Sequence, residues 1–281
     1  MSVLTVEGLC KRYPAFQLSD VSFDLGEGHI TGFIGRNGAG KTTTLKSLLN
    51  FVHPDSGKIE FFGERFAERE LDIKRRIGFV SGGVNYYPQK TLKTITSVTS
   101  SFYPGWDEKA YRRYLETFSL DEKKTPAALS EGMKVKYALA LALSHGAELL
   151  MLDEPTSGLD PVSRDELLDV FLDLAGKGKT ILFSTHITSD LDKCADDIIY
   201  IKGGRILAEA NLKDYLASYK LAVFEPGPVP ERAAGILIGR KRTKGGYSAL
   251  VESGRSGEAE AAGAKVSEAD LEAVMVHMEK E

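Results

Sequence analysis

The sequence predicts an α/β fold that carries a helical insertion and a C-terminal appendage. Short apolar runs suited to buried strands alternate with helical patterns, and residues 149–152 are four consecutive apolar residues of this kind. From residue 91 to residue 145 helical patterns dominate without a convincing strand, which predicts the insertion. Beyond residue 219 the pattern weakens and three closely spaced prolines interrupt it, so we expect a separate appendage there.

The elements of the main domain follow from apolar periodicity. We expect helices at residues 43–49, 70–76, 108–120 and 131–144, the third of them capped by Asp107. We expect strands at residues 3–6, 18–25, 30–34, 57–63, 77–81, 149–152, 180–184, 198–202 and 205–209. The pair Gly203 and Gly204 separates the last two strands, which predicts a hairpin with a two-residue turn.

The appendage, residues 220–281, has short strand-like runs at 221–224, 235–238 and 247–251. Its Gly/Ala/Glu-rich stretch, residues 253–264, is interpreted as mobile. Ser267 and Asp270 fit a capping box for a final helix that runs through Met278. The basic run 240–244 is interpreted as a solvated turn, with contact to anionic lipid or to a partner as the alternative.

Composition limits the function classes. The chain is 42% hydrophobic and 27% charged, as in a soluble globular protein. Its net charge of −4 argues against nucleic acid as the main partner, because that partner calls for a basic surface. Cys10 and Cys194 are too far apart for a disulfide framework or a metal motif, and no run approaches the ~18 apolar residues of a membrane span. We therefore expect a cytoplasmic protein whose membrane role, if it has one, comes through a partner.

A phosphate-binding loop is the clearest chemical signal. The pattern G-x-x-x-x-G-K-[ST] stands between a strand and a helix, at Gly35, Arg36, Asn37, Gly38, Ala39, Gly40, Lys41, Thr42 and Thr43. Glycines allow the loop to turn its N–H groups toward a phosphate, and the helix N-terminus favours the same anion. Lys41 is then expected along the β- and γ-phosphates of a nucleotide, with the Thr42 hydroxyl on Mg²⁺.

Two acids and a histidine stand at the ends of later strands. Asp153 is placed to hold Mg²⁺ through water, and Glu154 to orient or deprotonate an attacking water, although an Asp-Glu-Pro run can also be simple punctuation after a strand. His186 follows a strand expected beside that of Asp153, so its imidazole is expected to reach the γ-phosphate, whereas a lone histidine is more often structural. Tyr13 either stacks on an adenine ring or covers the sheet edge, and its spacing leaves both open.

Five separated motifs together resemble the ATP-binding subunits of ABC transporters over residues 1–218. They are the loop at 35–42, the run 129–133 (Leu-Ser-Glu-Gly-Met), Asp153 with Glu154, the run 157–160 (Ser-Gly-Leu-Asp), and His186. The resemblance implies a P-loop NTPase of ABC type with a mixed β-sheet core and an antiparallel β-subdomain. It places the ATPase domain at residues 1–219, with the helical insertion at about 84–146, and the extension at 220–281.

In that family, two ATPase domains pair head to tail around two ATP molecules. The resemblance implies that Ser130 and the Gly132 amide meet the γ-phosphate held by the second subunit, and that Asp160 makes a contact across the dimer. Glu154 is then the catalytic base, His186 clamps the γ-phosphate, and Tyr13 gains support as the adenine platform. The implied partners are separately encoded transmembrane permease subunits and a second ATPase, identical or homologous, at the inner face of the cell membrane; nucleic acid is not among them.

The sequence departs from the family pattern at two places. Glu131 and Met133 replace a Gly and a Gln of the usual signature, and Gly82 stands where the family has a Gln that touches Mg²⁺ and couples to the permease. Both departures, with the segment 103–107, resemble the YtrB-like exporter ATPases of Gram-positive bacteria, which predicts an exporter. The alternatives are a soluble ABC ATPase that does not serve transport, disfavoured by the single P-loop, and a regulatory subunit that hydrolyses slowly.

Overall fold

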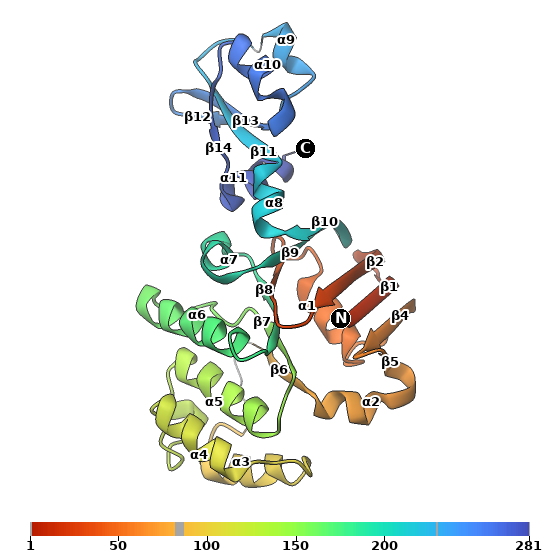
Figure 1. Ribbon diagram of the computed structural model, residues 1–281, viewed down its shortest axis with the longest axis vertical. Helices are drawn as coiled ribbons and strands as arrows, with labels where there is room; N and C mark the ends of the chain where they lie inside the picture. Colours follow the sequence, from red (N-terminus) through yellow and green to blue (C-terminus); the bar gives the residue numbers. More distant parts are fainter. Residues whose placement is uncertain (1, 82–86, 229, 281) are drawn as a thin grey trace. The chain divides into compact units, whose positions relative to one another are not determined.

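Strand β3 (Ile30–Ile34) lies inside a six-stranded sheet with the order β10-β9-β3-β8-β7-β6 (Figure 1). The other strands are β6 (Ile77–Ser81), β7 (Leu149–Asp153), β8 (Thr180–Thr185), β9 (Asp197–Lys202) and β10 (Arg205–Asn211). β3 pairs in parallel with β8 and β9, and β7 pairs in parallel with β6 and β8. Every residue of β3, β7 and β8 is buried, as expected for strands covered on both faces, and β7 accordingly has an unbroken apolar run at residues 149–152.

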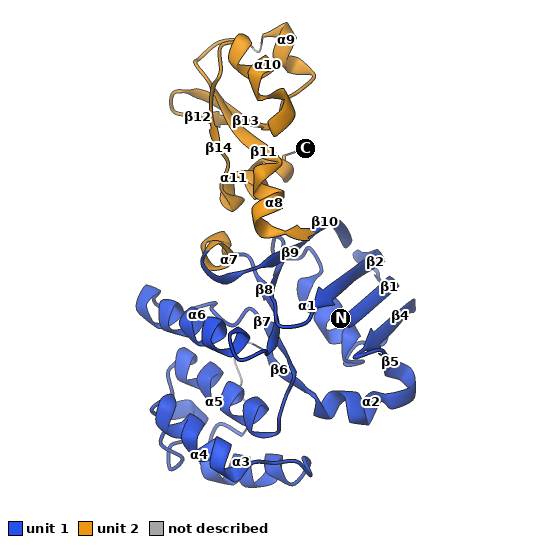
Figure 2. Cartoon of the chain, viewed as in Figure 1, with its two compact units in different colours: residues 1–186, 193–209 blue, residues 187–192, 210–281 orange. Residues whose placement is uncertain are grey.

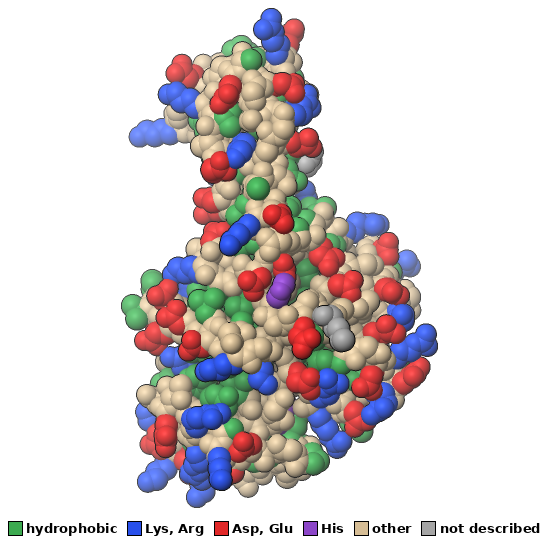
Figure 3. Space-filling view, viewed as in Figure 1, with side chains coloured by type: hydrophobic (Ala, Val, Ile, Leu, Met, Phe, Trp, Pro, Cys, Tyr) green, Lys and Arg blue, Asp and Glu red, His purple; other side chains and the backbone are tan. Residues whose placement is uncertain are grey.

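The computed structural model describes residues 2–81, 87–228 and 230–280. Two compact units divide the chain, as Figure 2 shows: residues 1–186 with 193–209, and residues 187–192 with 210–281. On the face of the first unit drawn in Figure 3, acidic and basic side chains are interspersed. None of the helices in the described ranges is long and apolar enough to cross a membrane.

A second, antiparallel sheet of the first unit has the order β2-β1-β4-β5. It consists of β1 (Ser2–Tyr13), β2 (Phe16–Gly26), β4 (Ser56–Phe61) and β5 (Glu64–Arg65). Its apolar face shares one core with the larger sheet, in which Leu4 of β1, Phe33 of β3 and Leu45 of helix α1 (Lys41–Leu48) are all fully buried. The mixed core and the antiparallel β-subdomain are therefore confirmed.

Helices complete the first unit. Helix α2 (Phe66–Arg75) precedes β6, and α6 (Pro161–Ala175) joins β7 to β8. The insertion consists of α3 (Leu92–Ser100), α4 (Glu108–Thr117), a short 3₁₀ turn η1 (Pro126–Ala128) and α5 (Glu131–Ser144). Asp107 caps α4 as predicted, since its carboxylate accepts hydrogen bonds from the Lys109 and Ala110 amides.

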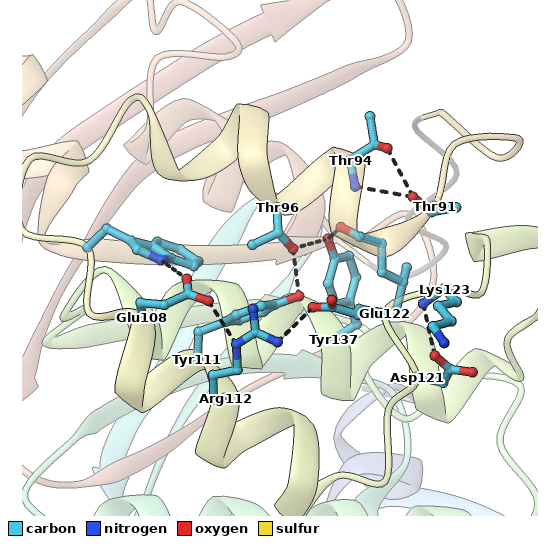
Figure 4. A network of polar contacts seen from close by, with 12 residues as sticks. Thr91, Thr94, Thr96, Glu108, Tyr111, Arg112, Asp121, Glu122, Lys123 and Tyr137 are labelled. Atoms are coloured by element: carbon cyan, nitrogen blue, oxygen red, sulfur yellow. Dashed lines mark hydrogen bonds and ion pairs between the residues drawn. The ribbon is translucent and has the colours of Figure 1, made fainter.

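Buried hydroxyl groups join the helices of the insertion (Figure 4). The Thr96 hydroxyl lies 2.8 Å from the Tyr111 hydroxyl and 2.9 Å from the Tyr137 hydroxyl. The Tyr137 hydroxyl also donates to the Leu92 carbonyl at 3.1 Å. These bonds satisfy polar groups that would be costly to bury alone, so they fix α3, α4 and α5 in one arrangement.

The second unit is a small α+β structure around a four-stranded antiparallel sheet of order β12-β13-β11-β14. Its strands are β11 (Tyr219–Phe224), β12 (Ile238–Thr243), β13 (Gly246–Glu252) and β14 (Lys265–Glu268). Its helical elements are most of α7 (Thr188–Cys194), together with α8 (Leu212–Ala217), α9 (Glu231–Ala234), η2 (Ser253–Arg255), α10 (Ser256–Ala261) and α11 (Leu271–Met278).

Several expectations for the appendage are wrong, and the strand expected at residues 235–238 begins only at Ile238. The basic run 240–244 is not a turn, because residues 240–243 belong to β12 and pair with β13. The stretch 253–264 forms η2 and α10, and burial of Ala259 against the unit's core orders it despite its composition. Ser267 lies in β14 rather than in a capping box, and Asp270 alone caps α11 by accepting from the Ala273 amide at 2.7 Å.

Candidate active site

The loop between β3 and α1 requires glycine on steric grounds. Gly38 and Gly40 have φ angles of 82° and 119°, in the left-handed region that favours glycine. A Cβ on Gly40 would lie 2.7 Å from Leu18 Cδ2, and one on Gly35 would lie 2.4 Å from the Ile201 carbonyl oxygen. Around Gly38 a Cβ would instead enter open space, which leaves the backbone accessible to a phosphate. Neighbouring strands therefore hold the loop in the shape that its sequence predicts.

Lys41 lies inside this loop with only 5% of its surface exposed. Its ammonium group donates to the Gly35 carbonyl at 2.7 Å and lies 3.1 Å from Glu154 Oε1. A buried cation needs such partners, because desolvation without compensation is expensive. The chain thus orients the cation and pairs it with a carboxylate before any phosphate is bound.

Asp153 gathers hydroxyl groups at the carboxyl end of β7. Its Oδ1 accepts from Thr42 Oγ1 at 3.1 Å and from Ser184 Oγ at 2.7 Å. Asp153 is 6% exposed and pairs in register with Ser184 of β8. Carboxylate and hydroxyl oxygens are the donors that Mg²⁺ prefers, so Thr42 and Asp153 fit that ion. Sequence reasoning missed Ser184, although its place in the strand beside Asp153 was a signal.

Glu154 bridges two charged groups directly after β7. Its Oε1 faces Lys41, and its Oε2 lies 2.8 Å from Nδ1 of His186. The Glu154 backbone has φ of 52°, a left-handed conformation uncommon outside glycine and one that recurs at functional sites. Its amide donates to the Ser184 hydroxyl at 3.0 Å, which helps to hold this conformation. The predicted grouping of Glu154 with His186 is therefore present in the structure.

These groups line a pocket of about 540 Å³. Its lining residues are Ala15, Phe16, Arg36, Asn37, Gly38, Gly40, Lys41, Thr42, Thr43, Glu154, Ser157 and His186. Tyr13 does not line this pocket; it is 39% exposed and pairs in register with Phe16, which does. Phe16 is the second residue that sequence reasoning missed, and its only signal was its place at the start of the alternating strand 16–26.

Gly35, Ala39 and Asp153 are not part of that lining, and neither are the residues predicted to act across a dimer. Ser130 caps α5 by accepting from the Met133 amide at 3.3 Å, and Gly132 is buried where a Cβ would lie 3.7 Å from Leu159 and Ser163 side-chain atoms. Asp160 caps α6, accepting from the Val162 amide at 3.0 Å and from the Ser163 hydroxyl at 2.6 Å. The Ser163 bonds hold the pKa of the Asp160 carboxyl below its ordinary value.

The two departures from the family signature have different outcomes. The Glu131 carboxylate pairs with the Lys134 ammonium at 2.6 Å along α5, so its charge has a partner on its own helix. Gly82 lies outside the described residues.

A phosphate loop with a buried lysine, two acids at a strand end and a histidine directly after the neighbouring strand define a P-loop ATPase site. The family model described as ABC transporter matches residues 18–157. The bacitracin transport ATP-binding protein BcrA of Bacillus licheniformis is 36% identical over 74% of this chain and 69% of its own length. The Nod factor export ATP-binding protein I of Burkholderia orbicola is 35% identical over 79% of this chain and 76% of its own.

A solved structure of an ATP-binding subunit of an ABC transporter matches with a TM-score of 0.68. It is 32% identical in sequence, over 75% of this chain and 91% of its own. This chain therefore belongs to the ABC transporter family, as an ATP-binding subunit with ATPase activity.

Proposed function

We propose that this chain is the ATPase of an exporter, in which two ATPase subunits close head to tail on ATP and drive separate transmembrane permease subunits. The observation that supports this most is an incomplete site: the pocket is lined by the phosphate loop, Glu154 and His186, while Ser130 and Gly132 stand outside its lining at the start of α5. A second subunit is needed to bring such a helix start to the phosphate. The bacitracin transport and Nod factor export functions of the relatives support export.

Each residue has a role in the proposed reaction. Lys41 exchanges its bond with Glu154 for the phosphate, and the released carboxylate then accepts the proton of an attacking water. His186 holds the other Glu154 oxygen and donates to the γ-phosphate. Thr42 and Asp153 would hold Mg²⁺, which neutralises the phosphate charge when it is bound.

We propose that the adenine ring of ATP binds at the turn between β1 and β2. Phe16 lines the pocket there, and Tyr13 lies across from it on β1. Tyr13 has an exposed face for stacking, which supplies affinity without requiring hydrogen bonds from the base. The Lys11 ammonium lies 5.8 Å from the Tyr13 ring centre and is paired with Asp55 at 2.9 Å.

We propose that Ser130, Gly132 and Asp160 make the contacts between the two subunits of the dimer. Ser130 is exposed at the helix start, so its hydroxyl is accessible to a γ-phosphate on Lys41 of the second subunit. The pairing of Glu131 with Lys134 supports a working signature, because the added carboxylate is compensated on its own helix. Asp160 is exposed at the N-terminus of α6, where it is available for a contact across the dimer.

We propose that the permease docks in an apolar groove of the insertion. Tyr87, Val98 and Phe102, which are 65%, 55% and 69% exposed, line or flank it together with Ile95 and Tyr103. Its volume is about 590 Å³. Exposed apolar surface of this kind commonly marks a protein interaction site. Docking there would place the ATPase at the inner face of the membrane through its partner.

The test is ATP-dependent dimerisation of Glu154→Gln, followed by light scattering with and without Mg²⁺ and ATP. We expect ATP to convert monomer into dimer, because a variant that binds but does not hydrolyse retains the bridging nucleotide. Ser130→Arg added to Glu154→Gln should keep ATP binding and lose the dimer, since it blocks the helix start. A chain that binds ATP and stays monomeric would contradict a head-to-tail homodimer and direct attention to a different ATPase partner.

A second candidate, a subunit that hydrolyses slowly, is favoured by one observation. Both carboxylate oxygens of Glu154 are engaged, one by Lys41 and one by His186, so the proposed base is not free in this conformation. For this function Glu154→Gln would leave a low turnover almost unchanged. A large fall in turnover would exclude it.

A further inference from the structure

The second unit carries a concentrated basic segment that ATP hydrolysis does not use. Arg240, Lys241, Arg242 and Lys244 lie on β12 and in the turn that follows it, and all four are exposed. Among the residues that the structure describes, none of the four has an acidic partner within ion-pair distance. The chain as a whole has a net charge of −4, so this is a local departure from its overall charge. Such a segment attracts anions.

Strand register gathers part of this charge beside an aromatic pair. Phe224 of β11 pairs with Tyr247 of β13, and Arg242 of β12 pairs with the same Tyr247. Residues paired across adjacent strands share a face, so the three form one row across the sheet. The Phe224 and Tyr247 rings are stacked, with centres 4.8 Å apart and planes 10° from parallel. Arg240 lies beside a register irregularity between Ile238 and Lys241, outside this row, but its charge acts on Tyr247.

The Tyr247 hydroxyl is an unused donor in this row. It is buried, and no hydrogen-bond partner for it exists among the described residues. Burial raises the pKa of this hydroxyl, an effect that the nearby Arg240 charge opposes, so it remains a neutral donor. A buried donor without an acceptor is unfavourable, and an anion oxygen brought beside it by Arg240 and Arg242 would satisfy it.

A cavity of about 460 Å³ lies at this hairpin. It is lined by Arg242, Lys244 and Tyr247 of the hairpin, and by Pro226 and Gly227, which follow β11. Gly246 has φ of 136°, and a Cβ there would lie 2.0 Å from the Phe224 carbonyl oxygen, so glycine allows the hairpin to close against the end of β11. We propose that this cavity binds a phosphate group, presented by a soluble phosphate ester or by a lipid headgroup. Arg242 and Lys244 supply the charge, and the Tyr247 hydroxyl supplies the neutral hydrogen bond.

Two probes distinguish the sources of the phosphate. Pyrophosphate binding is measured by calorimetry, and membrane binding by flotation with phosphatidylglycerol vesicles against phosphatidylcholine vesicles. Every chain is full length and carries Lys41→Ala, which weakens phosphate binding at the ATP pocket. The test variant adds Arg242→Gln with Lys244→Gln, and the matched control adds Lys123→Gln with Lys124→Gln, two exposed lysines of the insertion that change the net charge equally.

If the phosphate is soluble, the test variant should bind pyrophosphate at least about tenfold more weakly than the control, because two charged hydrogen-bond donors to the phosphate are lost. If the phosphate belongs to a lipid, the test variant should lose flotation with phosphatidylglycerol while the control keeps it. Equal behaviour of the two double variants with both probes would overturn the proposal, since binding would then follow net charge alone.

Tyr247→Phe separates a binding role from a structural one. Removal of an unpartnered hydroxyl should leave the melting temperature unchanged or raise it, while it weakens binding of whichever probe the hairpin recognises. If Tyr247→Phe keeps full binding, the hydroxyl has no part in the site. A lowered melting temperature would show that the hydroxyl already has a partner in the free protein.

Discussion

Lys41 in the first unit and the basic hairpin in the second unit present cations to phosphate in opposite ways. Lys41 is 5% exposed and is held by a carbonyl and a carboxylate, whereas Arg242 and Lys244 are exposed and lack acidic partners among the described residues. A buried cation cannot be left unpaired, so the fold supplies partners that a phosphate must replace. Surface cations need none, because water solvates them. The first arrangement gives a defined geometry, and the second gives attraction that salt weakens.

The largest expected effect concerns the acid that pairs with the buried cation. Glu154→Gln should lower ATP turnover by at least about 100-fold, because a neutral amide cannot accept the proton of the attacking water. ATP binding should persist, since Lys41 keeps its bond to the Gly35 carbonyl. Phosphate release and nucleotide binding are the two measurements. Glu116→Gln, an exposed acid on α4, is the control, and an equal fall in both variants would contradict the assignment.

Tyr13→Ala should weaken ATP binding by about tenfold and leave tripolyphosphate binding unchanged, because stacking acts on the base alone. Calorimetry with both ligands measures the difference. Tyr87→Ala removes a more exposed tyrosine in the insertion and should change neither affinity. If both ligands bind Tyr13→Ala as they bind the unsubstituted chain, Tyr13 covers the sheet edge and the adenine rests on Phe16 alone.

Salt should affect the two regions unequally. Raising ionic strength from about 0.1 M to about 1 M shortens the Debye length from about 10 Å to about 3 Å, so binding at the exposed hairpin should fall several-fold. ATP binding at the partly enclosed loop should fall less. The comparison uses calorimetry with ATP for the unsubstituted chain and with pyrophosphate, or flotation, for the Lys41→Ala chain. If salt weakens binding equally at both sites, the proposed difference between the buried cation and the exposed cations is wrong.

The comparison between the two units also applies to two neutral groups, the hydroxyls of Tyr137 and Tyr247. Tyr137→Phe should lower the free energy of unfolding by about 1 kcal/mol, because the bonds to Thr96 and to the Leu92 carbonyl are lost. Tyr247→Phe should cost nothing, since its hydroxyl has no partner in the described part of the chain. Urea denaturation of both variants measures the difference. Equal destabilisation would show that the Tyr247 hydroxyl is satisfied in solution.

The smallest effect is a pH dependence at His29. Asp197 lies 2.6 Å from His29 Nδ1 and raises the histidine pKa above 6.5 in the folded chain. The pair's contribution to stability is therefore complete below the unfolded-state pKa and is lost as pH rises through the folded-state value. It should be well under about 1 kcal/mol, because the pair is partly exposed. Urea denaturation at pH values from the unfolded-state to the folded-state pKa of His29 should show a decline in the free energy of unfolding, and His29→Gln should remove this decline. If the decline is unchanged in His29→Gln, another group causes it.

Local patterns predicted the central fold because the physics there is local. Four apolar residues before Asp153 indicate a strand buried on both faces, and the structure has β7 there with every residue buried. The appendage was less predictable. Residues 253–264 lack apolar periodicity, and their order depends on the burial of Ala259 against strands distant in sequence. Arg240 and Arg242 gave a turn-like composition, and only pairing with β13 makes them a strand.

For the site, the sequence by itself determined which chemical groups are present: the glycine loop with Lys41, the two acids at the end of β7, and His186. Motif spacing encodes the phosphate loop because the end of β3, the loop and the start of α1 are contiguous in the chain. The tertiary structure alone decided their partners. Ser184 reaches Asp153 because β7 and β8, which are far apart in sequence, lie in register, a relation that no single-segment periodicity contains. Phe16 lines the pocket because the tertiary fold packs it against Gly40 of the phosphate loop. The same holds for Phe224, Tyr247 and Arg242, which three strands bring into one row.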